Sequence, residues 1–147
     1  MQTLQRVRKT DLARNTRQVL QNVQRGRPAI IESHGQPEAA LIDISDYLIV
    51  RAVMRYYGQR PPIEIEAGLT DEAVSALADE QDRYDLVFAH HLAGAISLSR
   101  AAELLGLTWL DLRTRCLRLD VPLSMAPATL DEARADADVA LKLSAVA

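Results

Sequence analysis

The chain has 147 residues, of which 48% are hydrophobic and 25% charged, and its formal net charge is -3. This composition is typical of a globular protein and argues against wholesale disorder, and the length suits one domain or two small ones. No apolar run approaches the roughly 18 residues of a transmembrane helix, and the first residues lack the apolar core of a signal peptide, which predicts a cytoplasmic protein without membrane association.

The first third of the chain alternates between expected strands and helices. Residues 3–7 favour a short strand, and a helix is expected from Thr10, as its N-cap, to Gly26. Residues 29–33 and 39–44 favour two strands of a hairpin, joined by a loop of more than two residues. This order of elements predicts a small α+β domain at the N-terminus.

The helix expected after Thr10 has an apolar and a polar side. Its apolar stripe consists of Leu12, Ala13, Thr16, Val19, Leu20 and Val23. Ser45 is expected to cap a further helix over residues 46–57, and a linker follows over residues 58–69.

The second half opens with an anionic stretch, because residues 63–85 hold eight acidic side chains and one arginine. Thr70 is expected to cap a helix that runs to about Leu92. Shorter helices are expected from Ser99 to Leu105 and from Trp109 to about Leu119, and a capping box at residues 129–132 opens a final helix.

Charge is divided unevenly between the two parts of the chain. Residues 1–60 carry 10 basic and 5 acidic side chains, whereas residues 61–147 carry 7 basic and 15 acidic ones. The clustering favours a basic surface for nucleic acid in the first part and a different partner for the acidic remainder. A general preference for Arg over Lys would explain the choice of residue but not its position.

Three stretches of the first part occur in a specific joint spacing: residues 13–23, the turn Gly35-Gln36-Pro37, and residues 41–47. Together they resemble the Phd/YefM family of antitoxins over about residues 2–57. The resemblance implies a dimer whose fused sheets and paired N-terminal helices present a basic face to operator DNA, while a C-terminal segment neutralises a toxin. Glu32-Ser33-His34 departs from the family, which often has basic residues there.

The side chains of this segment suit DNA. An arginine fork matches phosphate oxygens and guanine edges, and an asparagine amide can bond to an adenine edge. Arg25 joins Arg14 and Arg17 on the polar side of the helix, although a solvated helix face is the alternative for any single arginine. The candidate DNA-binding residues are Arg6, Arg8, Lys9, Arg14, Asn15 and Arg17.

Residues 102–108, followed by Leu112, fit a helix-turn-helix pattern with Gly106 at the turn and Thr108 as the next cap. Residues 84–123 are similar to a family of small helix-turn-helix proteins proposed to be antitoxins of PIN-type toxins. Trp109, Leu112 and Cys116 are expected to face inward, and Arg115 stands where the pattern prefers an apolar residue. A second candidate DNA-binding set is Arg113, Thr114 and Arg118, unless this segment is structural or binds the toxin.

The candidate toxin-binding residues are acidic: Glu64, Glu66, Asp79, Glu80 and Asp82. The alternative is that they form a solvated acidic surface without a partner. His90 and His91 are adjacent and face different directions on a helix, and Cys116 is the single cysteine, so we expect no metal site. No catalytic constellation stands out, and we expect neither an enzyme nor a cofactor.

The sequence therefore predicts an α+β protein with a β-α-β-β-α domain at 1–57, a linker at 58–69, a helical region with a helix-turn-helix at 70–123 and a helix or tail at 124–147. We expect an antitoxin of a type II toxin–antitoxin module that binds operator DNA as a homodimer or higher even oligomer. Its toxin is expected to be a ribonuclease, PIN-like or RelE-like. The alternatives are a stand-alone transcriptional regulator and, with less support, a hydrolase that uses the paired histidines.

Overall fold

The computed structural model describes residues 4–123, so the helix expected after Thr129 lies outside the described residues. The described part is mixed α+β, with one three-stranded sheet and seven helices. The chain divides into two compact units between Tyr47 and Leu48. Within residues 4–123 no helix is both long enough and apolar enough to cross a membrane.

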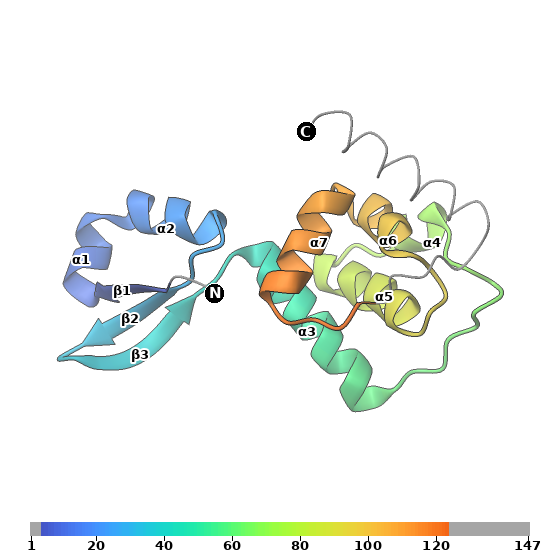
Figure 1. Ribbon diagram of the computed structural model, residues 1–147, viewed down its shortest axis with the longest axis horizontal. Helices are drawn as coiled ribbons and strands as arrows, with labels where there is room; N and C mark the ends of the chain where they lie inside the picture. The colour runs from blue at the N-terminus through green and yellow to red at the C-terminus, as the bar shows by residue number, and fades with distance from the viewer. Residues whose placement is uncertain (1–3, 124–147) are drawn as a thin grey trace. The chain divides into compact units, whose positions relative to one another are not determined.

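The first unit contains the sheet and two short helices. Its elements are β1 (Gln5–Arg8), α1 (Lys9–Arg14), α2 (Thr16–Gln24), β2 (Ala29–Ser33) and β3 (Gln36–Leu41). The central strand β2 runs parallel to β1 and antiparallel to β3. Helices α1 and α2 lie over one face of the sheet (Figure 1), and a small core between them consists of Val7, Val19, Val23, Ala29 and Ile31.

A network of side-chain amides ties β1 to α2. Asn22 Nδ2 donates to Gln5 Oε1 over 3.0 Å, and Gln5 Nε2 donates to the Arg27 carbonyl over 2.9 Å. Because Gln5 and Val7 lie on the same side of β1, this network borders the apolar core and fixes the strand under the helix.

The long helix predicted from Thr10 to Gly26 is two helices. Asn15 has φ -122° and ψ 34°, which are not helical values, and it separates α1 from α2. Helix α1 already starts at Lys9 after Arg8, so the predicted cap at Thr10 is wrong. The predicted end at Gly26 is confirmed, since its φ of 92° favours glycine.

Only part of the predicted apolar stripe reaches the core. Of the predicted stripe, Val19 and Val23 are buried and Leu12 is partly buried against the core. Ala13, Thr16 and Leu20 are exposed, so this part of the prediction is wrong. Thr16 and Leu20 lie on α2 with Val19 and Val23, so α2 contacts the small sheet only along a narrow part of the predicted stripe. The joint at Asn15 affects only the α1 residues Leu12 and Ala13.

The hairpin is tighter than predicted. Ser33 pairs with Gln36, which leaves His34 and Gly35 as a two-residue loop. Their φ angles of 52° and 74° are both positive, as in a type I′ turn, whose twist matches that of paired strands. The second strand therefore begins at Gln36 instead of Ala39.

The second unit is helical. Its elements are α3 (Ile44–Gln59), α4 (Asp71–Ser75), α5 (Glu80–Leu92), α6 (Leu98–Leu105) and α7 (Trp109–Arg118). Its core contains side chains from α3, α5, α6 and α7, of which the fully buried ones include Ile49, Val87, Phe88, Ala101, Leu112 and Cys116. Because α3 buries its side chains here from Leu48 onward, the division between the units lies before the boundary at residue 57 inferred from the sequence.

Two expected helix starts differ in the structure. The Asp43 carboxylate accepts from the backbone N–H of Ser45 over 2.9 Å, so Asp43 and not Ser45 caps α3. The helix predicted from Thr70 to Leu92 is divided into α4 and α5. Thr70 caps α4 as predicted, and the Asp79 carboxylate caps α5 by accepting from the Gln81 N–H over 2.8 Å.

The connection between α6 and α7 matches its sequence signals. Gly106 ends α6 with φ 70°, and Thr108 caps α7 by accepting from the Asp111 N–H over 3.0 Å. Leu112 and Cys116 are buried and Trp109 is partly buried, as predicted. The Asp111 carboxylate accepts from Arg115 Nε over 3.1 Å, which gives the half-buried arginine a partner at a position that usually holds an apolar residue.

Candidate nucleic-acid interface and acidic groove

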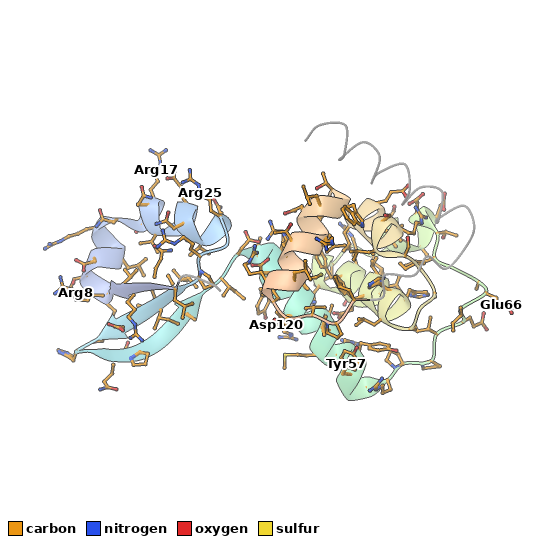
Figure 2. All side chains as sticks on the ribbon, in the orientation of Figure 1. Arg8, Arg17, Arg25, Tyr57, Glu66 and Asp120 are labelled. Atoms are coloured by element: carbon orange, nitrogen blue, oxygen red, sulfur yellow. The ribbon has the colours of Figure 1, made fainter. Side chains whose placement is uncertain are left out.

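Four arginines of the first unit are exposed and have no ion-pair partner among residues 4–123, namely Arg14, Arg17, Arg25 and Arg27. Arg14 ends α1, Arg17 lies in the first turn of α2, and Arg25 caps the C-terminus of α2. Arg17 and Arg25 project from the side of α2 that faces away from the sheet (Figure 2). We call Arg14, Arg17 and Arg25 the helix arginines.

Arg25 is absent from the candidate set predicted from the sequence, although it was placed on the polar side of the helix. Its distance of eight residues from Arg17 is a helical spacing that returns a side chain to the same side. This spacing was the signal that could have added it to the set.

Asn15 stands at the joint between α1 and α2. Its side chain is exposed and makes no capping hydrogen bond to α2. The amide therefore keeps both a donor and an acceptor for a ligand, and Arg14 and Arg17 lie one residue before it and two residues after it in the sequence.

The other predicted DNA-binding residues are paired with carboxylates of the same unit. Arg8 Nε lies 2.9 Å from Asp11 Oδ2, and Lys9 pairs with Glu38. Because Val7 faces the helices, strand alternation places Arg6 on the opposite face of the sheet, where it pairs with Glu32 over 2.6 Å. The six predicted residues are therefore not gathered on one surface.

Helix α7 presents fewer cations than the sequence suggested. Of the predicted outward residues only Thr114 is exposed, while Arg113 and Arg118 are half-buried. The Arg113 guanidinium lies over the Trp109 ring, 5.6 Å from its centroid. Leu110 and Leu117 are 49% and 53% exposed, so the outer face of α7 carries apolar side chains. Base edges in the major groove are read mainly by polar side chains, which this face offers only at Thr114.

The acidic stretch has structural and free members. Asp71 pairs with Arg100 over 3.2 Å, and Arg100 also donates to the Leu69 carbonyl, which joins the start of α4 to α6. Asp79 is the cap of α5. Glu66 and Glu80 are exposed, and neither forms an ion pair with a described residue.

Glu64 and Asp82 line a common groove of about 440 Å³ in the helical unit, between the segment after α3 and helix α5. We call it the acidic groove. It is also lined by Asp85 and His90 of α5 and by Arg55 of α3. Asp85 pairs with Arg55 over 3.5 Å, and Glu64 and Asp82 are exposed. Sequence reasoning missed Asp85 and His90 because only the packing of the segment after α3 against α5 brings Glu64 to them.

The adjacent histidines have different environments, as predicted. His91 is fully buried and its Nδ1 lies 3.1 Å from the Ile96 carbonyl oxygen, whereas His90 is half-buried and lines the acidic groove. Residues 4–123 contain no group of three or more histidine, cysteine or acidic side chains arranged to hold a metal ion.

The described residues thus present two surfaces of opposite charge, the helix arginines on the first unit and the acidic groove on the second. Comparisons with protein-family models, curated proteins and solved structures find no match. Guanidinium groups suit phosphate oxygens, and carboxylates beside apolar side chains suit organic cations. The two surfaces therefore suit different ligands.

Proposed function

We propose that this chain is an antitoxin of a type II toxin–antitoxin module that also represses its own operon by binding operator DNA. The observation that carries the DNA half is the exposure of the helix arginines around Asn15 without carboxylate partners among the described residues. Such guanidinium groups are free to bond phosphates and guanine edges, and the Asn15 amide is free to bond an adenine edge.

Arg6, Arg8 and Lys9 have a lesser role in this proposal. Each is exposed and ion-paired. An exposed ion pair contributes at most about 1 kcal/mol to stability, so a DNA phosphate can displace the carboxylate from the arginine or lysine. Breaking the ion pair offsets part of the attraction between the side chain and the phosphate. They contribute to the general attraction for DNA more than to its placement.

The proposed DNA-binding form is a homodimer, as the Phd/YefM resemblance implies. Helices α1 and α2 expose apolar or small side chains at Ala13, Thr16 and Leu20. Exposed side chains of this kind suit a contact with a second copy of the chain. The edge strand β3 is exposed along most of its length. Pairing two copies doubles the helix arginines available to a palindromic operator.

The toxin half of the proposal belongs to the helical unit. A ribonuclease needs a basic cleft for RNA, and an acidic surface on the antitoxin can cover that cleft by charge complementarity. The similarity of residues 84–123 to antitoxins of PIN-type toxins favours a PIN-like toxin over a RelE-like one. The exposed leucines of α7 support protein contact there more than a second DNA contact.

A gel-shift titration with the DNA upstream of the gene tests the DNA half. We expect the double variant Arg14→Ala with Arg17→Ala to lose at least about tenfold in affinity, equivalent to about 1.4 kcal/mol. For the unaltered chain, each neutralised phosphate is expected to add about -0.9 to the slope of log affinity against log salt. The matched control is Arg51→Ala with Arg55→Ala, which removes the same charge from α3 and should leave affinity within about twofold. Equal losses in both double variants would refute the proposed surface.

Co-expression with the protein encoded by the adjacent reading frame tests the toxin half. We expect that protein to co-purify with the chain and its growth arrest to be relieved. If no partner co-purifies and DNA binding persists, the alternative of a stand-alone regulator replaces the antitoxin.

A further inference from the structure

The acidic groove is lined by apolar as well as acidic side chains. Most of its lining is apolar, from the segment after α3, from Leu77 and from α5: Pro61, Pro62, Ile63, Leu77, Leu86 and Ala89. Its volume of about 440 Å³ lies in the range of about 300–1,000 Å³ typical of pockets for small molecules. The space suits one long side chain together with its flanking peptide.

The groove carries negative charge that the described residues do not neutralise. Asp85 is compensated by Arg55 and accepts from Gln81 Nε2 over 2.9 Å. Glu64 and Asp82 have no ion-pair partner within residues 4–123, and both are exposed. An occupant that enters the apolar part therefore meets two carboxylates without a counter-charge.

His90 adds an acceptor to the same groove. Its Nδ1 lies 2.9 Å from the Leu86 carbonyl oxygen, which can only accept a hydrogen bond. Nδ1 must therefore be the donor, and in the neutral ring Nε2 is left as an acceptor. Arg55 also lines the groove, but its guanidinium is paired with Asp85, so the unpaired polar groups of Glu64, Asp82 and His90 are acceptors, which match a ligand rich in donors.

We infer that the acidic groove receives an arginine side chain of the partner protein. A guanidinium group has five N–H donors in a planar fork and is weakly hydrated, so it can lie against proline and aliphatic walls while it bonds carboxylates. A lysine ammonium is a compact and strongly hydrated charge, and it fits these walls less well. That the partner is the toxin rests on the proposed function, whereas the preference for arginine rests on the groove alone.

The test is an NMR titration of the full-length, isotopically labelled chain with two short peptides. The first is acetyl-Gly-Arg-Gly-amide, and the second carries citrulline, which has nearly the same shape and no charge. We expect saturable shifts confined to residues 61–64, 77 and 82–90 with the arginine peptide, and none with the citrulline peptide. Equal shifts with both peptides, or shifts spread over other helices, would overturn the inference.

Matched variants separate the groove from general charge attraction. The double variant Glu64→Gln with Asp82→Asn is expected to bind the arginine peptide with about tenfold lower affinity. Glu72→Gln with Asp120→Asn removes two exposed charges of the helical unit that lie outside the groove and outside the candidate toxin-binding set, and it should change affinity less than about twofold. Equal weakening by this control, or equal binding of a lysine peptide, would overturn the assignment to arginine.

Co-purification of the toxin with the Glu64→Gln, Asp82→Asn variant distinguishes the two proposals. We expect the toxin to be retained less well by this variant than by the control Glu72→Gln, Asp120→Asn. If both variants retain the toxin equally while the peptide result stands, the groove binds arginine but is not the toxin contact. If no toxin binds the unaltered chain, the proposed function fails, and the peptide titration still decides the groove.

Discussion

At the residue scale, two leucines of α7 show how position decides the role of one residue type. Leu112 is fully buried, whereas Leu110, two positions earlier, is 49% exposed. Only the first contributes its full apolar surface to the core, and only its removal leaves a cavity. The helical pattern around residue 112 predicted this inward position from the sequence.

We expect Leu112→Ala to lower the free energy of unfolding by about 2–5 kcal/mol, because truncation leaves a cavity among packed side chains. Leu110→Ala should change it by no more than about 0.5 kcal/mol. Urea unfolding followed by circular dichroism measures both. Similar losses in the two variants would mean that the outer face of α7 is buried in solution.

His34 has a backbone conformation that few residue types other than glycine adopt. Its φ is 52°, in the left-handed region, where a side chain costs about 1–2 kcal/mol and asparagine is better tolerated than most residues. We expect His34→Val to destabilise the first unit by about that amount and His34→Asn to leave it unchanged or more stable. Thermal unfolding compares the variants, and an equal effect of the two would contradict the type I′ turn.

At the element scale, helix caps decide where the helices of the second unit begin. Thr70 and Thr108 could be predicted because a hydroxyl before a helical pattern bonds to a nearby N–H of its own chain. The start of α5 at Asp79 and the joint at Asn15 could not be predicted in the same way. Polar residues also occur inside helices, and tertiary packing decides whether a helix continues.

We expect Asp79→Ala to destabilise the helical unit by about 1 kcal/mol, because the first turn of α5 loses its acceptor. Asp79→Asn should keep most of this stability, since asparagine caps about as well as aspartate. Denaturant unfolding measures the stability of both.

The same pair of variants tests whether Asp79 also belongs to the toxin-binding set. The asparagine variant keeps the cap and removes the charge, so weaker toxin retention by this variant would assign Asp79 a direct contact. Unchanged toxin retention would mean that Asp79 acts only as the N-cap of α5.

At the scale of the whole molecule, the two units have separate cores. The core of the first unit contains Val7, Val19 and Ile31, and no residue of it is shared with the core that contains Leu112. Local stability in proteins varies between such cooperative regions. The two cores should therefore respond separately to mutation.

Amide hydrogen exchange of Leu112→Ala tests this separation in the full chain. We expect faster exchange in α5, α6 and α7 and little change in the paired amides of β1 and β2. A general loss of protection in both units would show that they unfold together.

The sequence by itself determined the features that depend on neighbouring residues. These are strand β2 with its bounds, the caps at Thr70 and Thr108, the end of α6 at Gly106, and the division of charge along the chain. Each arises from a side chain and the backbone next to it, so local spacing carries the information.

Only the tertiary structure decided which distant residues share a surface. It placed Arg6 across the sheet from the helices, joined α3 to the helical core, and brought Glu64 into one groove with Asp82 and His90. The periodicity of each segment shows which of its side chains share a side, but not which other segment packs against that side. That choice follows from burying the apolar sides of all segments together, which no local pattern specifies.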